Sequence, residues 1–252
     1  MPLLVFQLQA PLASWGDTAV GEYRPSHDYP GISMLVGLLG AALGLRRENE
    51  AAHAALRDHY GYAVGVQSSG KLLRDYHTAQ VPSQASLKKR PHASRRDELA
   101  IPKHDLNTIL STRDYRQDSA CLVAVHASGQ GPYALEALAE ALRKPRFVLY
   151  LGRKACPPAA PLHPRIMTAA TADAAFDAYL AELTAEIDKH RDRSGAPLLR
   201  APGEVVRIAW GHGIEGGPTP DLTTTRKDHP IRRKGWQFGD RTEHVALMRK
   251  EA

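Results

Sequence analysis

Two short segments of the sequence pair arginine with an Asp-Tyr dipeptide and carry residue types that suit RNA recognition. They are Leu73-Arg74-Asp75-Tyr76-His77-Thr78 and Ser111-Thr112-Arg113-Asp114-Tyr115-Arg116. An arginine offers a fork of N–H donors to a phosphate, and a tyrosine ring beside it offers a surface on which a base can stack. The two segments therefore predict an RNA contact through Arg74, Tyr76, His77, Arg113, Tyr115 and Arg116.

The same residues allow a second interpretation, a ribonuclease centre that needs no metal ion. In such a centre one group deprotonates the 2′-hydroxyl, another protonates the leaving oxygen, and a cation stabilises the phosphorane. Tyr76, His77 and a nearby lysine have the chemistry for these three roles. The residues by themselves leave both binding and cleavage open.

A third segment, Tyr150-Leu151-Gly152-Arg153-Lys154, directly follows an apolar run that predicts a strand at 147–151. Gly152 permits a tight turn that lifts the two cations clear of the sheet edge. Backbone amides together with arginine and lysine at a strand end can hold phosphates. We therefore interpret this turn as a phosphate contact, and three more basic residues shortly before it add to the positive field: Arg143, Lys144 and Arg146.

Other motifs argue against a metal or a cofactor. Residues 211–216 match GxGxxG, but Gly217-Pro218-Thr219-Pro220 follows and cannot begin the helix that a dinucleotide site needs. The sequence has no GxxxxGK[ST], HExxH, CxxC or GxSxG motif, and its twelve histidines form no pair at metal-ligand spacing with a cysteine or carboxylate. We also find no paired carboxylates of the kind that a two-metal nuclease uses. We therefore expect neither cofactor nor metal.

Positive charge is concentrated in three segments. The 252 residues carry 33 Lys and Arg against 27 Asp and Glu, a net charge of +6. Residues 71–116 contribute +5, residues 143–165 contribute +6 without any acid, and residues 226–241 contribute +4, so the rest of the chain is acidic. This pattern indicates a polyanionic partner such as nucleic acid. Autonomous binding of double-stranded DNA fits less well, because no predicted helix has the basic face of a recognition helix.

The composition, 43% hydrophobic and 24% charged, is typical of a globular protein and excludes wholesale disorder. No run of about 18 uncharged apolar residues occurs, so we expect no transmembrane helix. Residues 1–8 lack the basic start of a signal peptide. The two cysteines, Cys121 and Cys156, are too few for a disulfide scaffold. These features predict a cytoplasmic protein without membrane contact.

The elements that must position these residues follow from hydrophobic periodicity. We predict strands at 2–9, 62–66, 120–126 and 147–151, and helices at 34–43, 48–59 and between Pro132 and Pro145. Ser33 is the expected N-cap of the first helix and Gly44 its end. Small residues at helical spacing predict that another element approaches this helix closely: Gly37, Gly40, Ala41 and Gly44.

The resulting order is strand, helix, strand, excursion, strand, helix, strand, the βαββαβ plan of ferredoxin-like and RRM folds. The polar, basic excursion lies between the two central strands. A later helix capped by Thr171 has an apolar stripe, and four strands follow it at about 204–210, 222–226, 235–238 and 243–248. We predict an α+β fold with a palm at 1–74 and 119–165, a basic insertion at 75–118, and a C-terminal helix and β extension at 166–252 packed on the palm.

Four segments occur in an order and at a spacing that are typical of a known family. They are Ala10-Pro11-Leu12-Ala13-Ser14-Trp15-Gly16, the helix Gly37 to Gly44, Leu73 to Thr78, and Lys144-Pro145-Arg146 through Gly152-Arg153-Lys154-Ala155-Cys156-Pro157. The chain resembles the CasD family, the subunit of the type I-E CRISPR Cascade complex that holds the 5′ end of the guide. The resemblance covers about residues 3–165 and is weaker beyond. The chain departs from the family in the Lys/Arg-rich stretch from Lys88-Lys89-Arg90 to Arg95-Arg96 and in its C-terminal third.

This resemblance implies a modified RRM palm with a protruding β-hairpin thumb. It implies binding of the crRNA 5′ handle, the CasC backbone subunit and the CasA large subunit as partners, and only an indirect role at target DNA. In this family a separate subunit, CasE, processes the guide, so the resemblance implies a non-catalytic RNA-binding subunit in antiviral defence. Relatives in the I-C subtype cleave precursor RNA with Tyr, His and Lys, which keeps the endoribonuclease alternative open.

The RNA-binding residues that we expect fall into two sets. Gly152, Arg153 and Lys154 grip handle phosphates from an exposed turn, so the fold should survive replacement of the two cations. The second set comprises Trp15, Arg24, Arg74, Tyr76, His77, Arg113, Tyr115, Arg116 and Arg146. For Trp15 a place in the core is an equal alternative, because it lies in a loop just beyond a strand.

Overall fold

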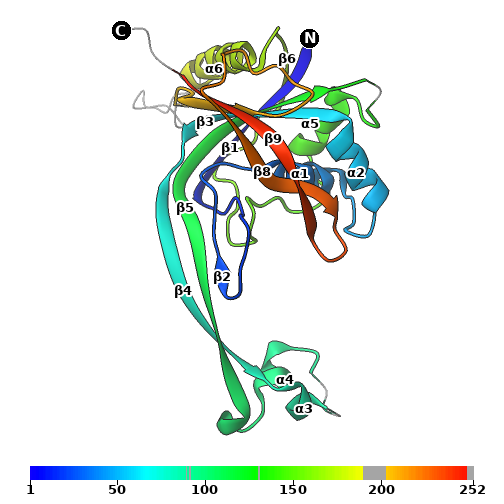
Figure 1. The fold of residues 1–252 in the computed structure, drawn as a ribbon, viewed down its shortest axis with the longest axis vertical. Helices are drawn as coiled ribbons and strands as arrows, with labels where there is room; N and C mark the ends of the chain where they lie inside the picture. The colour runs from blue at the N-terminus through cyan, green and yellow to red at the C-terminus, as the bar shows by residue number, and fades with distance from the viewer. Residues whose placement is uncertain (89, 91, 130, 190–202, 249–252) are drawn as a thin grey trace.

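The protein is an α+β fold built on one large sheet, from which a long two-stranded arm extends (Figure 1). The computed structural model describes residues 1–88, 90, 92–129, 131–189 and 203–248. The main path of the sheet runs β6-β1-β5-β3-β7-β9-β8, and β2 and β4 pair with β5 outside this path. The β2–β5 pair is parallel, and the other strand pairs in these ranges are antiparallel.

The first two thirds of the chain provide four strands of the main path and the helices that connect them. The elements are β1 (Pro2–Ala13), β2 (Tyr23–Arg24), α1 (Ile32–Leu43), α2 (Glu50–Asp58), β3 (Tyr60–Ser68), β5 (Leu106–Ala127), α5 (Leu135–Arg143) and β6 (Arg165–Thr168). Six of the seven elements predicted in this part are therefore present near their predicted positions.

The seventh, a strand at 147–151, is wrong. This segment is irregular, and its apolar residues Phe147 and Val148 are 44% and 85% exposed. Instead of joining the sheet, the amides of Arg146 and Phe147 donate to carbonyls of the last turn of α1, Ala42 and Ala41. The place beside β1 is taken by β6, which pairs with Pro2–Val5 and begins at Arg165, the last residue of the predicted palm.

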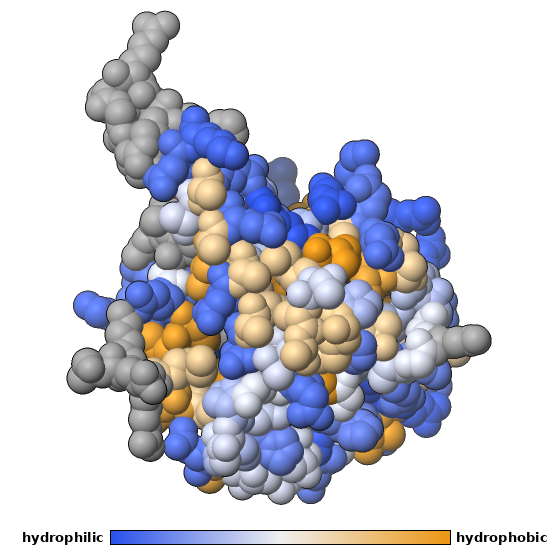
Figure 2. Space-filling view, turned by 90° about the horizontal axis from the view of Figure 1, so that it is seen from above, coloured by the Kyte–Doolittle hydropathy of each residue, from blue (hydrophilic) through white to orange (hydrophobic). Residues whose placement is uncertain are grey.

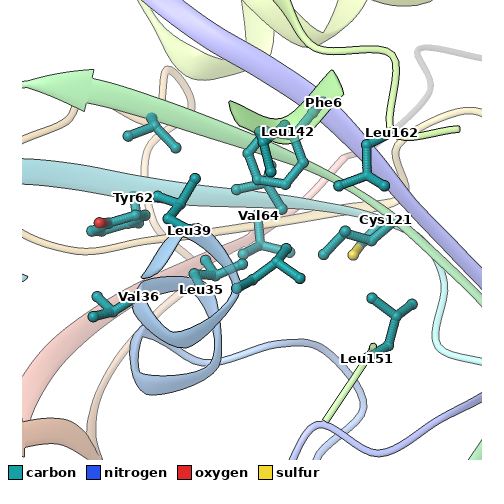
Figure 3. Packing of buried hydrophobic residues seen from close by; sticks show 14 of the residues in the cluster. Phe6, Leu35, Val36, Leu39, Tyr62, Val64, Cys121, Leu142, Leu151 and Leu162 are labelled. Carbon is teal, nitrogen blue, oxygen red and sulfur yellow. The ribbon is translucent and has the colours of Figure 1, made fainter. Parts of the chain in front are cut away.

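Both faces of the sheet are covered, which explains why β1 and β3 are almost uninterrupted runs of buried residues. On one face Leu4, Phe6 and Leu8 pack with α1, α2 and α5 (Figure 3). On the other face the alternate residues Leu3 and Val5 pack with α6. The sheet is thus the middle layer of three.

The C-terminal third adds α6 (Ala172–Lys189), β7 (Arg207–Trp210), β8 (Leu222–Arg232) and β9 (Gln237–Leu247). The helix and a strand-rich tail were predicted, although two predicted strands at 235–238 and 243–248 form the single strand β9. Phe176 of α6 lies so close to Gly65 in β3 that a Cβ there would be 2.9 Å from its ring. Close packing therefore seals α6 onto the sheet.

The arm is a hairpin of β4 (Lys71–Pro82) and the first half of β5, paired from Lys71↔Gln117 to Pro82↔Leu106. It leaves the sheet at Gly70, whose φ is +68° and where a Cβ would be 2.3 Å from the Gln117 carbonyl oxygen. Its tip carries α3 (Gln84–Leu87), α4 (Arg95–Leu99) and a 3-10 turn at Lys103–Asp105, and none of these has a buried residue. Of the predicted basic stretch at the tip, Lys89 lies outside the described residues.

The β8–β9 hairpin curls back over α1 and is held there by a buried ionic network. Arg241 contacts Asp228 at 2.5 and 3.0 Å and Glu243 at 2.5 Å, and Arg226 contacts Asp228 at 3.2 Å. The Tyr29 hydroxyl donates to Glu243 at 2.7 Å. Two cations and two carboxylates therefore neutralise one another and join β8 and β9 to the loop before α1.

The same network also caps the N-terminus of α1. The prediction of Ser33 as the N-cap is wrong. The N-cap is Gly31, which has no side chain to offer, and the amide of Ile32 donates instead to Asp228 at 3.0 Å. A Cβ on Gly31 would lie 2.1 Å from that carboxylate oxygen. The predicted helix end at Gly44 is confirmed, with a φ of +78°.

The face opposite the arm is mixed in character, with hydrophilic side chains between apolar ones (Figure 2). None of the helices in the described ranges is both long and apolar enough to cross a membrane.

Replacing Asp228 by alanine tests the ionic network. In the variant the buried arginines Arg241 and Arg226 lose one of their carboxylate partners. The first amide of α1 also loses its acceptor. We expect the free energy of unfolding to fall by about 3–5 kcal/mol, measured by urea denaturation. Asp240→Ala, on the exposed surface of β9, is the control and should change stability by less than about 0.5 kcal/mol. Equal stabilities of the two variants would contradict a structural role for the network.

Candidate nucleic-acid interface

Most of the residues predicted to bind RNA meet where the arm joins the sheet. Arg74, Arg113, Tyr115 and Arg116 lie at the base of the arm, on β4 and β5. Arg24 lies on β2, whose backbone pairs with Arg113, and the turn with Gly152, Arg153 and Lys154 packs against the same region. Three of the set lie elsewhere: Tyr76 and His77 farther along the arm, and Arg146 beside the end of α1.

The centre of this junction is Asp114, which is 2% exposed. Arg74 donates to both of its carboxylate oxygens, at 2.9 and 3.1 Å, and the Tyr23 hydroxyl donates to Oδ2 at 2.5 Å. The Arg74 guanidinium also lies over the Tyr23 ring, 5.1 Å from its centroid. The hydrogen bonds from Arg74 hold the pKa of Asp114 below its usual range. Arg74 is therefore held in an ion pair, which reduces what it can offer a phosphate.

The predicted phosphate-binding turn is fixed to the same junction. Arg153 donates to the main-chain carbonyls of Asp114 and Arg24, each at 3.0 Å, and lies 4.6 Å from the centroid of the Tyr115 ring. Gly152 has a φ of +88°, and a Cβ on it would be 1.6 Å from the Ser14 carbonyl oxygen. The expectation that both cations stand free in an exposed turn is thus wrong for Arg153, which is half-buried, whereas Lys154 is exposed.

Trp15 occupies the core, the alternative weighed from the sequence. Its side chain is 3% exposed, and its indole N–H donates to the Ser119 hydroxyl at 3.2 Å. Tyr115, at 9% exposure and covered by Arg153, is likewise a packing residue in this structure. Neither ring is placed to stack on a base without rearrangement.

Tyr76 and His77 are exposed on the arm, but neighbouring residues of a strand point to opposite faces. His77 lies beside Asp75, with 3.7 Å between Nδ1 and Oδ2, whereas Tyr76 is 64% exposed on the other face. The three-group ribonuclease centre considered from the sequence needs both side chains at one phosphate. The strand geometry separates them.

Three predicted arginines line a shallow hollow of about 640 Å³ between β2 and the arm: Arg24, Arg113 and Arg153. Arg113 is half-buried and has no side-chain partner among the described residues. Arg116, three residues farther along β5, donates to the His27 carbonyl at 3.2 Å. The hollow places Arg113 beside Arg24 and Arg153, whose side chains donate to main-chain carbonyls and hold the local backbone in place.

A larger cleft of about 720 Å³ lies on the other side of this turn and was missed by the sequence analysis. The C-terminal β8–β9 hairpin forms one wall with Arg232, Arg233 and Trp236, and Arg46 and Arg47 at the end of α1 form another. The signal that could have found it is the +4 charge of residues 226–241. Nothing in the sequence alone places this segment opposite α1.

In the described part of the chain, no three His, Cys, Asp or Glu side chains lie close enough together to hold a metal ion.

Comparison with known proteins places this geometry in a family. The profile of the CRISPR-associated protein Cas5, in its Cas5d form, matches residues 3–242. The chain belongs to the Cas5 family. The CRISPR system Cascade subunit CasD of Escherichia coli (strain K12) is 31% identical over 167 residues, which cover 63% of this Cas5 chain and 68% of that protein.

Two solved structures are similar to this Cas5 protein. A chain of a CRISPR RNA-guided surveillance complex superposes with a TM-score of 0.62 at 24% identity, covering 98% of this chain and 90% of that one. A crystal structure of a Cas protein has a TM-score of 0.57 at 25% identity, covering 99% and 96%. The α+β fold with its large antiparallel sheet is therefore the fold of known CRISPR-associated proteins.

Replacement of Asp114 by asparagine tests the junction. The variant keeps the shape of the side chain but loses the ion pair, so we expect stability at pH 7 to fall by about 2 kcal/mol. Because the folded pKa of Asp114 is depressed, its contribution is present above about pH 4, the unfolded pKa, and is lost as the pH falls further. Urea unfolding at pH 7, 5 and 3 should show the difference from the native protein shrinking only at pH 3.

Asp75→Asn, whose side chain is 44% exposed on the neighbouring strand β4, is the control and should stay within about 0.5 kcal/mol of the native protein at each pH. If the free energy of unfolding of Asp114→Asn stays equally far below the native value at pH 3, loss of the carboxylate charge is not the cause of the destabilisation.

Proposed function

We propose that this Cas5 protein is a non-catalytic RNA-binding subunit of a CRISPR Cascade surveillance complex and holds the 5′ handle of the crRNA. A CasC-type backbone subunit and a CasA-type large subunit are the expected protein partners, and contact with target DNA is indirect. The family and the CasD relative support membership of such a complex. The proposal for RNA depends on the surface of the chain itself.

The palm supports this proposal through its topology. The strand order β6-β1-β5-β3, with α1 and α2 between β1 and β3 and α5 between β5 and β6, is that of a ferredoxin-like βαββαβ unit. We infer that this unit is the modified RRM palm predicted at 1–74 and 119–165, which β6 extends to Thr168. An RRM binds RNA on an open sheet face, but here α6 covers that face with Phe176 and Tyr179, both at most 1% exposed. RNA must then bind elsewhere.

The observation that carries the proposal is a set of cations that form no ion pair with an acid among the described residues. They lie on the arm, at the junction, beside the end of α1 and in the cleft: Arg46, Lys71, Lys103, Arg113, Arg146, Lys154 and Arg232. Release of counterions from bound RNA by such cations is the main source of affinity for a polyanion. These positions form the proposed path of the handle.

The arm suits the role of a thumb. It exposes apolar side chains along its length, with Leu72, Tyr76 and Ile109 each about half exposed or more. Such side chains provide contact area for a neighbouring subunit and a stacking surface for unpaired bases. The arm therefore offers charge and apolar area together, as a wedge between guide and backbone subunit requires.

The first test separates a cation that binds from one that supports the fold. We expect Lys154→Ala to lower the slope of log affinity for a handle RNA against log salt by about 0.7, with unchanged thermal stability. Arg153→Ala should instead lower stability by about 2 kcal/mol, because two carbonyls lose a charged donor. Fluorescence titration between 50 and 300 mM salt and thermal unfolding measure the two effects.

Lys189→Ala, on the exposed surface of α6, is the charge-matched control and should leave the salt slope unchanged. A native slope for Lys154→Ala would remove that residue from the phosphate contacts. Gel electrophoresis of a precursor repeat transcript, incubated with the protein in EDTA, tests the enzyme alternative. An intact transcript supports a binding role, and shortened products that disappear in His77→Ala would favour the endoribonuclease.

The second test concerns the tip of the arm. Replacing residues 83–105 by a short Gly-Ser turn keeps the whole β4–β5 ladder and removes the two helices, which bury nothing. We expect thermal stability to stay within about 2 °C of the native value and assembly with guide and backbone subunit to fail on size-exclusion chromatography. If the shortened protein still assembled a complex with full affinity for target DNA, the tip would have no role in assembly and would be only a solvated loop.

A further inference from the structure

The tip of the arm, residues 83–105, is strongly basic and stands apart from the junction. The sequence of the tip contains six Lys and Arg against three Asp and Glu. Figure 1 shows the tip at the end of the arm that is remote from the sheet. The tip follows Pro82, eight residues along β4 from Arg74, which corresponds to about 25 Å of extended strand. A partner bound at the tip is therefore distinct from one bound at the junction.

Two of the three acids at the tip serve its own structure. Asp97 accepts from the Ser94 amide at 3.1 Å and from the Ser94 hydroxyl at 2.8 Å, as part of the capping box of α4. Glu98 forms an ion pair with Arg95 at 2.6 Å. Because these carboxylates act within α4, they do not neutralise the other cations of the tip.

Two arginines hold the tip in shape. Besides its ion pair with Glu98, Arg95 donates to the Gln80 carbonyl on β4. Arg90 donates to the Ala100 carbonyl at 2.5 Å, which joins the two ends of the segment that carries α4. The tip is thus fastened to the arm and closed upon itself by its own side chains.

The side chains of Lys88 and Arg96 take no part in this support. Both residues are exposed, and neither side chain forms an ion pair or a hydrogen bond with the described residues. Exposed cations of this kind release counterions from a polyanion when they contact its phosphates, which favours binding. These two residues are therefore the binding cations of the tip.

The composition of the tip narrows the class of polyanion. Residues 83–105 contain no Phe, Tyr or Trp, so the tip has no ring on which an unpaired base can stack. Its aliphatic side chains Leu87, Leu99 and Ile101 are only partly exposed, so it lacks the apolar anchor that the centre of a protein interface requires. A nucleic-acid duplex hides its bases and presents about one negative charge per 1.7 Å. It requires neither stacking nor an anchor.

We propose that the tip binds the phosphate backbone of a nucleic-acid duplex through Lys88 and Arg96, without reading its sequence. Contacts to phosphates position a duplex and need no recognition helix in a groove. The inference goes beyond the proposed function, which concerns the crRNA handle. DNA and RNA duplexes offer the same phosphates, so the test includes both.

The full-length double variant Lys88→Ala with Arg96→Ala tests the proposal. The probes are a labelled DNA duplex and a labelled RNA duplex of about 20 base pairs, long enough for the two phosphate contacts, and handle RNA, each titrated by fluorescence anisotropy between 50 and 300 mM salt. We expect the slope of log affinity against log salt for the DNA duplex to fall by about 0.9 per lost phosphate contact, or about 1.8 for the pair. Thermal stability should stay native, because neither side chain supports the fold.

Two controls accompany this variant. Lys88→Arg with Arg96→Lys keeps both charges and should keep the native salt slope, because these contacts depend on charge rather than on sequence readout. Lys189→Ala with Lys227→Ala removes two exposed cations that lie away from the tip. That second control should also leave the duplex slope unchanged.

The outcomes separate this inference from the proposed function. A reduced slope for either duplex, with a native slope for handle RNA, supports the inference and identifies the duplex as DNA or RNA. Native slopes for both duplexes, or no binding of them by the native protein, would overturn it.

Two further outcomes would also overturn the inference. An equal fall in slope for handle RNA would assign the tip to the path of the handle. Failure of the double variant to assemble with guide and backbone subunit, at native duplex affinity, would assign the tip to a protein partner. The proposed function is tested by Lys154→Ala on handle RNA, so either proposal can fail alone.

Discussion

The buried carboxylate of Asp114 is the constraint on which the arrangement of this Cas5 protein depends. A charge that is 2% exposed must be neutralised, and Arg74 from β4 and Tyr23 from β2 do so. The main-chain carbonyl of the same residue accepts from Arg153, whose turn is fixed in place by Gly152 against Ser14. Asp114 therefore links its own strand β5 to three segments that are distant in sequence. The direction of the arm relative to the sheet follows from that shared residue.

The covered sheet imposes the second constraint. Helices lie on both faces, so any nucleic acid must contact the parts that stand beyond these layers: the arm, the turn with Lys154 and the cleft under the β8–β9 hairpin. The ionic network around Asp228 and Arg241 holds that hairpin over α1. At the junction, Arg74 is paired with a carboxylate and Arg153 donates to two main-chain carbonyls, whereas Lys154 is exposed. The structure thus distinguishes arginines that support the fold from a cation that is exposed to solvent.

The errors of sequence interpretation have physical causes that particular segments illustrate. Residues 147–151 have the composition of a strand, but their neighbours bond to the end of α1, and the four-residue strand β6 pairs with β1 instead. A strand as short as β6 carries too little periodicity to be recognised.

Ser33 has the chemistry of an N-cap, yet the N-cap is Gly31, two residues earlier, because Asp228, nearly 200 residues away, accepts from the first amide of the helix. Arg153 and Lys154 are adjacent and alike in charge, and only the contacts of Arg153 distinguish them.

The sequence by itself determined the class of fold, most element positions, the basic insertion and the three charged segments, because periodicity and composition are local properties. The family resemblance was also contained in four local motifs, and the family profile confirms it. Tertiary structure alone decided that Trp15 is core, that Tyr76 and His77 face apart, and that Arg233 of the β8–β9 turn lies against Gly37 of α1. These facts depend on which distant groups satisfy a buried charge or a hydrogen bond. Such pairing is settled only when the chain has folded and water has been excluded from the groups involved.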